Sequence, residues 1–383
     1  MMLNFFYLYG IIWSVTLFLY NMGWSDYCIP LEPKLVVFLV ISIICSFLLG
    51  FVFRSRFRFV RIDRFPKRSS IITIAVVLFA FLEYVYCRQI PLFGIITGAN
   101  TYTSFTGIPT LHVINSTIAS FYSQYLFYLF LCFRKKKKLL IEYTSLLVFV
   151  HLFEFNRGGL LISVFISANL FFASISHRIR LKHIILGSVF LFVVLYFFGV
   201  LGNLREVGSW NSDYLETIGG FNSKYPSWLP KQFMWPYLYL VCSLWNLTSI
   251  FSQISISLLG FVSTVLPDFI TKRIMPGFVS KKAIKLLVVS FTTYTGYGTT
   301  LLYGGIVGMY VKYVFLVVYY GLILKIVSCD LKYYMPTMGI ISAIVTMFFF
   351  TNTVSYSAIS FPVAYPFLLV LFRATTKNQI KKK

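Results

Sequence analysis

Long apolar runs alternate with short basic segments along most of this chain. A helix needs about 20 predominantly apolar residues to cross the hydrocarbon core of a bilayer, and many of the runs approach that length. The pattern therefore predicts ten membrane-spanning helices, which lie at about 3–21, 35–53, 70–86 and 111–132, as a pair between 139 and 176, and at 184–202, 305–326, 334–352 and 354–372.

The basic residues gather between these runs. Seven Lys and Arg lie in 54–68, five in 134–138 and three in 177–183, and five more lie from Arg373 to the end of the chain. Because loops rich in Lys and Arg stay in the cytoplasm, these segments predict that both termini are cytoplasmic. No basic segment precedes the first apolar run, so we do not expect a cleaved signal peptide. The net charge of +23 follows from this topology and does not indicate nucleic-acid binding.

The stretch 203–304 interrupts the pattern, and we favour placing it on the outer side of the membrane. In that interpretation 233–251, which is rich in Trp and Tyr, is an interfacial or half-inserted helix. The alternative is a further pair of spans at about 236–257 and 284–304, which would bring the cations between 272 and 285 inside. Because a pair of spans does not change the parity, the sequence leaves this choice open.

The composition agrees with a membrane protein. Of the 383 residues, 58% are hydrophobic and only 12% are charged, whereas soluble domains have about 25% charged residues. We therefore expect an all-α, polytopic membrane helical bundle that forms a single domain over 1–383, with about 10–12 transmembrane helices and a large outer loop region at 203–304. Soluble enzymes are excluded. The scattered cysteines and the lack of HExxH, GxSxG, Walker or Asp-x-Asp motifs predict no disulfide framework, no metal site and no cofactor.

The densest group of ionisable residues lies near the outer end of the fifth span. His151, Glu154 and Arg157 recur at every third residue and should lie along one side of that helix. Asn156 and the two glycines after Arg157 predict a tight turn, where a guanidinium can contact a phosphate with two N–H groups. The alternative is structural: Glu154 and Arg157 neutralise each other, and His151 bonds a neighbouring helix.

Other polar and aromatic residues are expected on the same side. Arg88 and Arg205 follow predicted spans and are candidates either for binding a polyanion or for anchoring at the interface. The stretch 203–245 is rich in aromatic residues, including Trp210, Trp228 and Tyr214. Such rings pack on sugars or form a belt at the membrane surface, and the sequence does not separate these two roles.

Several segments together resemble a known family. Glu83 is followed by RQIPLFG and then by TYTSFTGIPTLH at 101–112, an RGG turn at 157–159 joins two spans, Arg205 opens a basic outer loop, and SFTTYTGYGTTLLYGGIVG at 290–308 precedes a late span. In this layout, which covers most of the chain, the sequence resembles the O-antigen polymerases (Wzy-type) of Gram-negative envelopes. Related polymerases often carry an acidic residue beside the late glycines, where this chain has Tyr303, so no acidic role is expected there.

The resemblance implies a metal-independent glycosyltransferase at the periplasmic face of the bacterial inner membrane. A growing glycan on undecaprenyl pyrophosphate would pass to a sugar hydroxyl of a single lipid-linked repeat unit, releasing the lipid pyrophosphate. Membrane lipid and a chain-length regulator, itself a membrane protein, are the further partners considered. Such a site needs cations for the pyrophosphate, a base for the hydroxyl and a groove for sugars. The expected residues for the pyrophosphate are Arg157, Arg205 and Arg88. Those for the base are Glu154, His151 and Glu83, and those for the sugar groove are Trp210, Trp228 and Tyr214.

Three other functions fit the pattern less well. A flippase for the same lipid-linked oligosaccharide also has many spans and cationic cavities, but the hundred-residue stretch after 202 argues against its even spacing. An O-antigen ligase shares the large outer loop and is poorly separated from a polymerase by sequence. A membrane O-acyltransferase would need a histidine deep in a span, a role that only His151 could fill.

Overall fold

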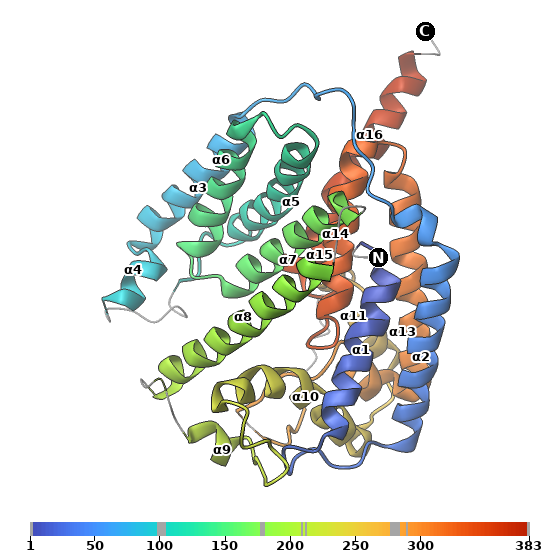
Figure 1. The fold of residues 1–383 in the computed structure, drawn as a ribbon. Coiled ribbons are helices and arrows are strands. Elements are labelled where there is room, and N and C mark those ends of the chain that lie inside the picture. The colour runs from blue at the N-terminus through green and yellow to red at the C-terminus, as the bar shows by residue number, and fades with distance from the viewer. Residues whose placement is uncertain are drawn as a thin grey trace.

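The structure is a computed structural model that describes residues 3–97, 105–176, 181–207, 210, 213–275, 284–288 and 290–380. Within these residues the fold is all-helical, as predicted, and the only β-type pairing is an isolated bridge between Ser25 and Phe221 (Figure 1). The helices are α1 (Phe5–Asn21), α2 (Pro33–Val52), η1 (Arg54–Phe57), α3 (Ile71–Cys87), α4 (Pro91–Ile96), α5 (Leu111–Cys132), α6 (Lys137–Leu146), η3 (Leu147–Leu152), α7 (Arg157–Ser174), α8 (Leu181–Val207), α9 (Tyr214–Ile218), η5 (Lys231–Phe233), α10 (Met234–Ser249), η6 (Ile250–Gln253), α11 (Leu258–Val265), α12 (Asp268–Ile274), α13 (Gly298–Val327), α14 (Leu331–Met347), α15 (Ser357–Ser360), η7 (Phe361–Val363) and α16 (Ala364–Ile380).

A helix, or a run of two or three consecutive helical segments, occupies each of the ten ranges that the apolar runs predict. Among the described residues, α2, residues 185–203 of α8, and α13 are long and apolar enough to cross a membrane. Shorter apolar helices include α1 and α3. These helices indicate a membrane protein, while ten crossings remain a prediction.

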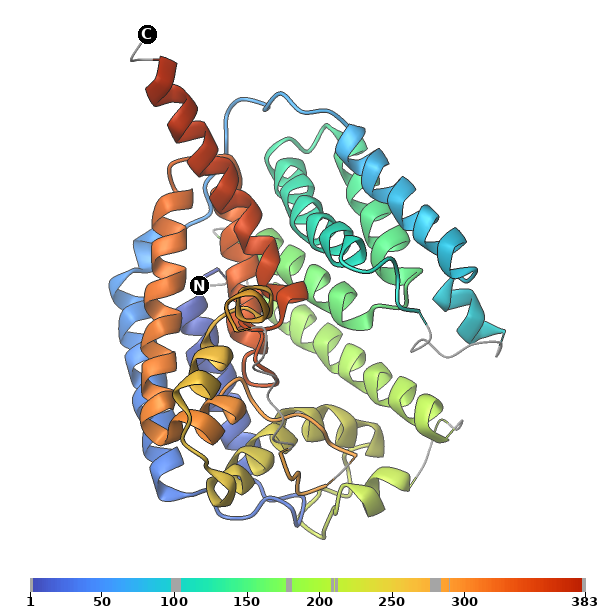
Figure 2. The same cartoon turned by 180° about the vertical axis from the view of Figure 1, so that it is seen from behind.

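Helix α14 holds the bundle together at its centre. It is buried along nearly its whole length and contacts α1, α5, α7 and α13 (Figures 1 and 2). On one side of it α3, α5, α6 and α7 pack together, and on the other side α1 packs against α2. A helix that is apolar on all faces must be buried in protein or surrounded by lipid, and α14 takes the first of these environments.

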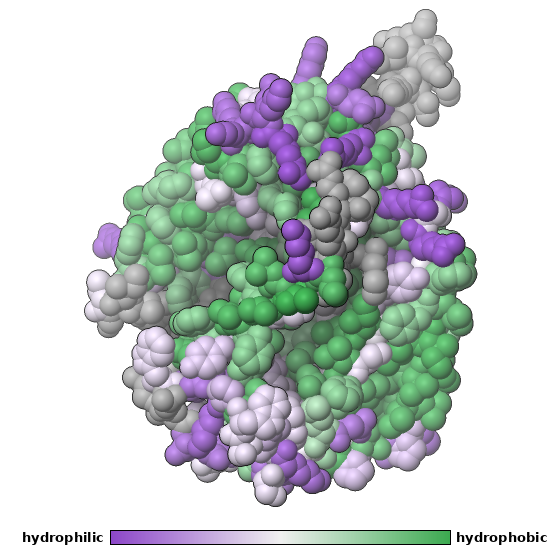
Figure 3. All heavy atoms as spheres, viewed as in Figure 1, coloured by the Kyte–Doolittle hydropathy of each residue, from purple (hydrophilic) through white to green (hydrophobic). Residues whose placement is uncertain are grey.

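Helix α8 is in the opposite situation, because most of its apolar side chains are exposed. Phe190 and Leu191, near its middle, are both more than half exposed. Figure 3 shows hydrophobic side chains over the middle of this face and hydrophilic ones gathered at the upper and lower ends. Exposed apolar surface of this extent is expected where a helix faces lipid.

Three of the basic segments lie at one end of the molecule. The 54–68 connection, the turn between α5 and α6 and the end of α16 all lie at the upper end in Figure 1. At the opposite end, α9 and α10 lie beside the loop between α1 and α2, where Ser25 Oγ donates to the Gly219 carbonyl at 2.6 Å. This arrangement places the stretch after α8 away from the basic segments, as the predicted topology requires.

Within 203–304, helix α10 occupies most of the range 233–251 predicted as an interfacial or half-inserted helix, and the described residues do not form the alternative span at 284–304. Helix α10 is buried, and Trp235 and Trp245 on it are almost inaccessible, because it packs against α1, α8 and α13. The described residues between 284 and 297 are irregular, so no helix covers 284–304. The aromatic composition of α10 therefore reflects packing inside the protein and not a membrane-surface belt.

Helix α13 begins earlier than predicted and is broken at Gly305, where φ is +61°. The carbonyls of Leu302 and Tyr303, just before the break, accept hydrogen bonds from the backbone N–H groups of Ser255 and Ser257 at 2.8 and 2.9 Å. The segment that contains α11 thus satisfies carbonyls that the break leaves free, as a membrane interior demands.

Candidate functional site

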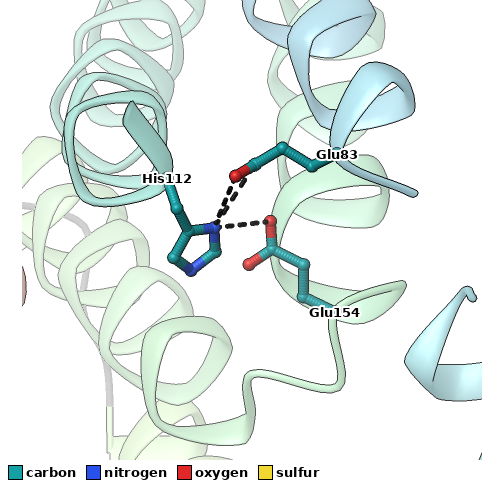
Figure 4. A group of neighbouring side chains, drawn as sticks. All are labelled: Glu83, His112 and Glu154. Atoms are coloured by element: carbon teal, nitrogen blue, oxygen red, sulfur yellow. Dashed lines mark hydrogen bonds and ion pairs between the residues drawn. The ribbon is translucent and has the colours of Figure 1, made fainter. Parts of the chain in front are cut away.

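Two glutamates and a histidine meet at the end of α3 and α5 that lies away from the basic segments. They are Glu83 of α3, His112 of α5 and Glu154 of the turn before α7, and Figure 4 shows the three side chains pointing toward one another. One ligand-type atom from each lies within 4.8 Å of the others. We call these three residues the carboxylate–histidine group.

The contacts within this group are unequal. Glu83 is fully buried, and its two carboxylate oxygens lie 3.2 Å from His112 Nδ1. Glu154 Oε1 is buried and lies 4.0 Å from the same nitrogen, and it has no hydrogen-bond partner among the described side chains. Because a buried charged oxygen normally has a partner, Glu154 is the unsatisfied member of the group.

The backbone before α5 holds the group in place. The N–H of Ile108 donates to Glu83 Oε1 at 3.0 Å. Gly107 has a φ of +64°, and a Cβ at this position would lie 2.6 Å from His112 Cγ. Gly107 is therefore required both by the left-handed backbone and by the close approach of the imidazole ring.

Strained backbone is concentrated around the same residues. Among the described residues, the only non-glycine residues with positive φ are Arg88, Thr110 and Phe155. Arg88 caps the helix that carries Glu83, Thr110 precedes α5, and Phe155 follows Glu154. Such conformations cost about 1–3 kcal/mol each and persist where the surrounding structure enforces them, often at functional sites.

The predicted alignment of His151, Glu154 and Arg157 on one helix face is wrong. Residues 147–152 form a π-helix, in which the N–H of Phe153 bonds the Val148 carbonyl, and a turn over 153–155 ends the helix before Glu154. His151 lies inside the protein with its Nε2 3.5 Å from Ser120 Oγ, outside the carboxylate–histidine group. The prediction assumed a regular α-helix, whereas a π-helix has a wider turn that changes which residues share a face.

The predicted tight turn is shifted by a few residues. Asn156 caps α7 by accepting from the Gly159 N–H at 2.9 Å, and both glycines lie in the first turn of that helix. Gly159 is still needed for space, because a Cβ there would lie 2.9 Å from His151 Nδ1. Arg157 is the first residue of α7, and its side chain lies outside the described part of the structure.

The other two predicted arginines differ in their positions. Arg88 is exposed at the end of α3, where it lines a surface cavity of about 480 Å³ with Tyr84 and Phe93. Arg205 lies in the last turns of α8, which is longer than predicted, and its side chain is outside the described residues. Arg88 is thus only five residues from Glu83 along the chain.

The aromatic residues of the outer stretch are divided between two environments. Trp210 and Trp228 are 60% and 78% exposed, and neither lines a cavity with Tyr214. Lys231, three positions after Trp228, donates to Asp213 and Glu216, and its hydrogen bond to Asp213 lowers the pKa of that carboxyl.

Tyr214 instead lines a cavity of about 310 Å³ with residues that the sequence analysis did not select. Trp235 and Tyr239 contribute aromatic rings from α10, and Thr292 and Thr293 contribute from the SFTTYTGYGTT segment. Rings beside hydroxyl-bearing residues are the type of surface on which sugars pack.

Sequence reasoning also missed His112, although this residue ends the TYTSFTGIPTLH segment that carries the family resemblance. The fold and this group define an all-helical membrane protein with buried ionisable side chains at one end. Comparisons with protein-family models, with curated proteins and with solved structures gave no match to this chain.

Proposed function

We propose that this protein polymerises undecaprenyl-pyrophosphate-linked O-antigen repeat units by glycosyl transfer at the periplasmic face of the bacterial inner membrane. In this proposal ten helices cross the membrane and both termini are cytoplasmic. A chain-length regulator in the same membrane is the partner we would expect.

The observation that carries the proposal is the convergence of three segments. Glu83 just before RQIPLFG, His112 at the end of TYTSFTGIPTLH and Glu154 just before the RGG sequence are separated by 29 and 42 positions in the chain. These are three of the segments on which the resemblance to O-antigen polymerases rests. Their side chains nevertheless form one group at the end away from the basic segments.

The group suits the chemistry of the transfer. The acceptor hydroxyl oxygen would bond the anomeric carbon of the growing glycan while the bond from that carbon to the pyrophosphate oxygen breaks. The electron pair of the broken bond leaves with the lipid pyrophosphate, and the hydroxyl proton passes to the carboxylate–histidine group. We assign stabilisation of the leaving pyrophosphate to Arg157, with Arg205 and Arg88 as further candidates, because a planar guanidinium binds phosphate oxygens in pairs.

The cavity beside Tyr214 supplies a second element of the proposal. Its aromatic rings and threonines come from the outer stretch and from the late motif, two further segments of the resemblance. We assign it to a sugar of the lipid-linked glycans, and we expect the exposed Trp210 and Trp228 to contact sugars outside it.

The test is the lipopolysaccharide of a strain that lacks the gene. A strain without a polymerase still flips and ligates single repeats, so it should show core plus one repeat and no ladder. Loss of a flippase or of a ligase leaves bare core, because no repeat then reaches lipid A. A bare-core profile would sink the polymerase assignment.

The same assay tests Arg157. A bidentate contact cannot be replaced by a point charge, so Arg157→Lys should lose most of the ladder while the protein level in the membrane stays normal. Lys231→Arg, an exposed cation of the outer stretch, is the matched control and should retain the ladder. A complete ladder in Arg157→Lys would remove the pyrophosphate role from this residue.

A flippase remains the second candidate because of the interior of α13. Lys312 on this helix is fully buried near the break at Gly305, and it donates to the Thr264 carbonyl and to Asn352 Oδ1. Broken helices and intramembrane cations are common at the substrate sites of transporters. The bare-core outcome described above would favour a flippase or a ligase over a polymerase.

A further inference from the structure

The carboxylate–histidine group has the donor atoms and the geometry of a metal site. Each of its three side chains offers one ligand atom, and these atoms come from three separate elements. A tetrahedral metal with bonds of about 2.1 Å holds its ligand atoms about 3.4 Å apart. His112 Nδ1 is 3.2 Å from the Glu83 oxygens and 4.0 Å from Glu154 Oε1, so small side-chain rotations are sufficient to reach that spacing.

The buried oxygen of Glu154 is an independent indication of a missing cation. Its side chain is only 3% exposed and points into the group, yet within the described part of the structure Oε1 has no hydrogen-bond partner. Among the described residues, neither Glu83 nor Glu154 forms an ion pair with a Lys or Arg side chain. Two carboxylates beside a single imidazole thus leave a buried site with room for positive charge.

Glu142 shows how this fold treats a buried glutamate that has a structural role. Its carboxylate accepts from Arg68, Ser70 and Thr73, at 2.5 to 2.9 Å, so both oxygens are satisfied. The residues that the structure describes offer Glu154 no comparable set of donors. The difference argues that the Glu154 carboxylate is placed for a ligand and not for packing.

The surroundings of the group also suit a metal. The Ile108 N–H holds the Glu83 carboxylate, and Gly107 lets the backbone approach the His112 ring, so two of the three side chains are oriented before any ligand binds. His112 is 26% exposed, which leaves one side of the group accessible. Three protein ligands and an accessible position are the arrangement of catalytic metal sites.

We infer that Glu83, His112 and Glu154 bind one divalent first-row metal ion, such as Mn²⁺ or Zn²⁺. One nitrogen and two oxygens without a thiolate favour these ions over soft metals. The sequence predicts no metal because the chain lacks an Asp-x-Asp motif, and the family resemblance implies a metal-independent transfer, so this inference departs from both expectations. That motif concerns metals that hold a nucleotide diphosphate, whereas this site combines residues far apart in the chain.

The site rests on geometry alone, whereas its role rests on the proposed function. A metal lowers the pKa of a hydroxyl group that coordinates it, and it polarises phosphoryl oxygens. At the accessible position it would act on the acceptor hydroxyl or on the lipid pyrophosphate. The group would then promote loss of the hydroxyl proton by holding the metal that lowers the pKa of this hydroxyl.

The experiment measures metal binding by the full-length protein in lipid nanodiscs, purified without a polyhistidine tag and stripped with a chelator. Mn²⁺ is titrated and the free ion is followed by electron paramagnetic resonance, with Zn²⁺ as a competitor. We expect one Mn²⁺ per chain and a loss of affinity of more than about tenfold in both His112→Asn and Glu154→Gln. Glu32→Gln, an acidic residue outside the group, is the matched control and should bind as the unaltered protein does.

A second measurement guards against variants that fail to fold. Bound metal should raise the thermal unfolding midpoint of the unaltered protein and of Glu32→Gln, but not that of His112→Asn. The inference is overturned if the unaltered protein binds no metal, or if His112→Asn and Glu154→Gln bind it unchanged at a site elsewhere. A core-plus-one-repeat profile of the deletion strain together with no metal binding would reject the metal and keep the polymerase. Metal binding together with a bare-core profile would do the reverse.

Discussion

At the scale of single residues, the group depends on positions that have no ionisable side chain. Gly107 lies against the His112 ring, and Thr110 adopts a conformation that few side chains tolerate. Such conformations persist only where the surrounding structure enforces them, and Gly107 is buried against the His112 ring. Substitutions here should therefore affect the group as much as substitutions of its members.

Gly107→Ala tests this dependence. An alanine Cβ would meet His112 Cγ at 2.6 Å and would also oppose the positive φ, so we expect a loss of about 1–3 kcal/mol in unfolding free energy. The thermal unfolding midpoint of the purified protein measures this loss. Gly187→Ala in α8 is the control, because a Cβ there meets no atom within 4 Å, and it should be neutral or slightly stabilising. Equal midpoints for the two variants would contradict the packing role of Gly107.

At the scale of elements, buried polar contacts join segments that are separate in sequence. Lys312 of α13 contacts Thr264 at the end of α11 and Asn352 after α14, and Asn352 Nδ2 also donates to the Thr264 carbonyl at 2.8 Å. The three groups form a closed set. Removing one member has a cost that depends on which partners it leaves unpaired.

This arrangement predicts an asymmetry between two variants. Lys312→Met leaves Asn352 and Thr264 bonded to each other, so the stability should change by less than about 1 kcal/mol. Asn352→Leu leaves the ammonium with the Thr264 carbonyl alone and should cost at least about 2 kcal/mol. The double variant should recover much of that loss, as a thermal unfolding cycle of the four proteins would show. Additive losses would mean that Lys312 and Asn352 act independently.

At the scale of the whole molecule, charge and hydrophobicity are segregated along one axis. Hydrophilic side chains gather at the two ends, and the basic segments 54–68 and 134–138 lie at the end opposite α9 and α10 (Figures 1 and 3). The carboxylate–histidine group lies away from the basic end. The proposed function requires the basic segments to be cytoplasmic and the group to lie on the outer side of the membrane.

Cysteine labelling in intact cells tests this orientation. A membrane-impermeant thiol reagent should reach Ser223→Cys and should miss Ser69→Cys and Lys136→Cys, although all three positions are exposed in the structure. The exposed Cys329 is replaced by Ser in all of these proteins. Permeabilised cells provide the control, since all three cysteines should then react. Labelling of position 136 but not of position 223 in intact cells would invert the topology and remove the proposed function with it.

The amino-acid sequence by itself determined the helical class and the position of the main helices. Runs of apolar residues and the cations between them predict helices from local sequence, because each helix forms its backbone hydrogen bonds within its own segment. For the same reason the sequence placed the ends of α3, α5 and α7 within a few residues. It failed where packing overrides local pattern: α10 looked interfacial and is buried, and the π-helix before Glu154 separates His151 from the group.

Only the tertiary structure decided which ionisable residues form a group. His112 lies 29 positions from Glu83 and 42 from Glu154, and no periodicity in the sequence connects them. Their meeting depends on how α3, α5 and the α6 to α7 connection pack, and on the strained backbone that directs each side chain inward. Long-range packing of this kind depends on the shapes of many side chains together, and no local pattern of hydrophobic and polar residues encodes it.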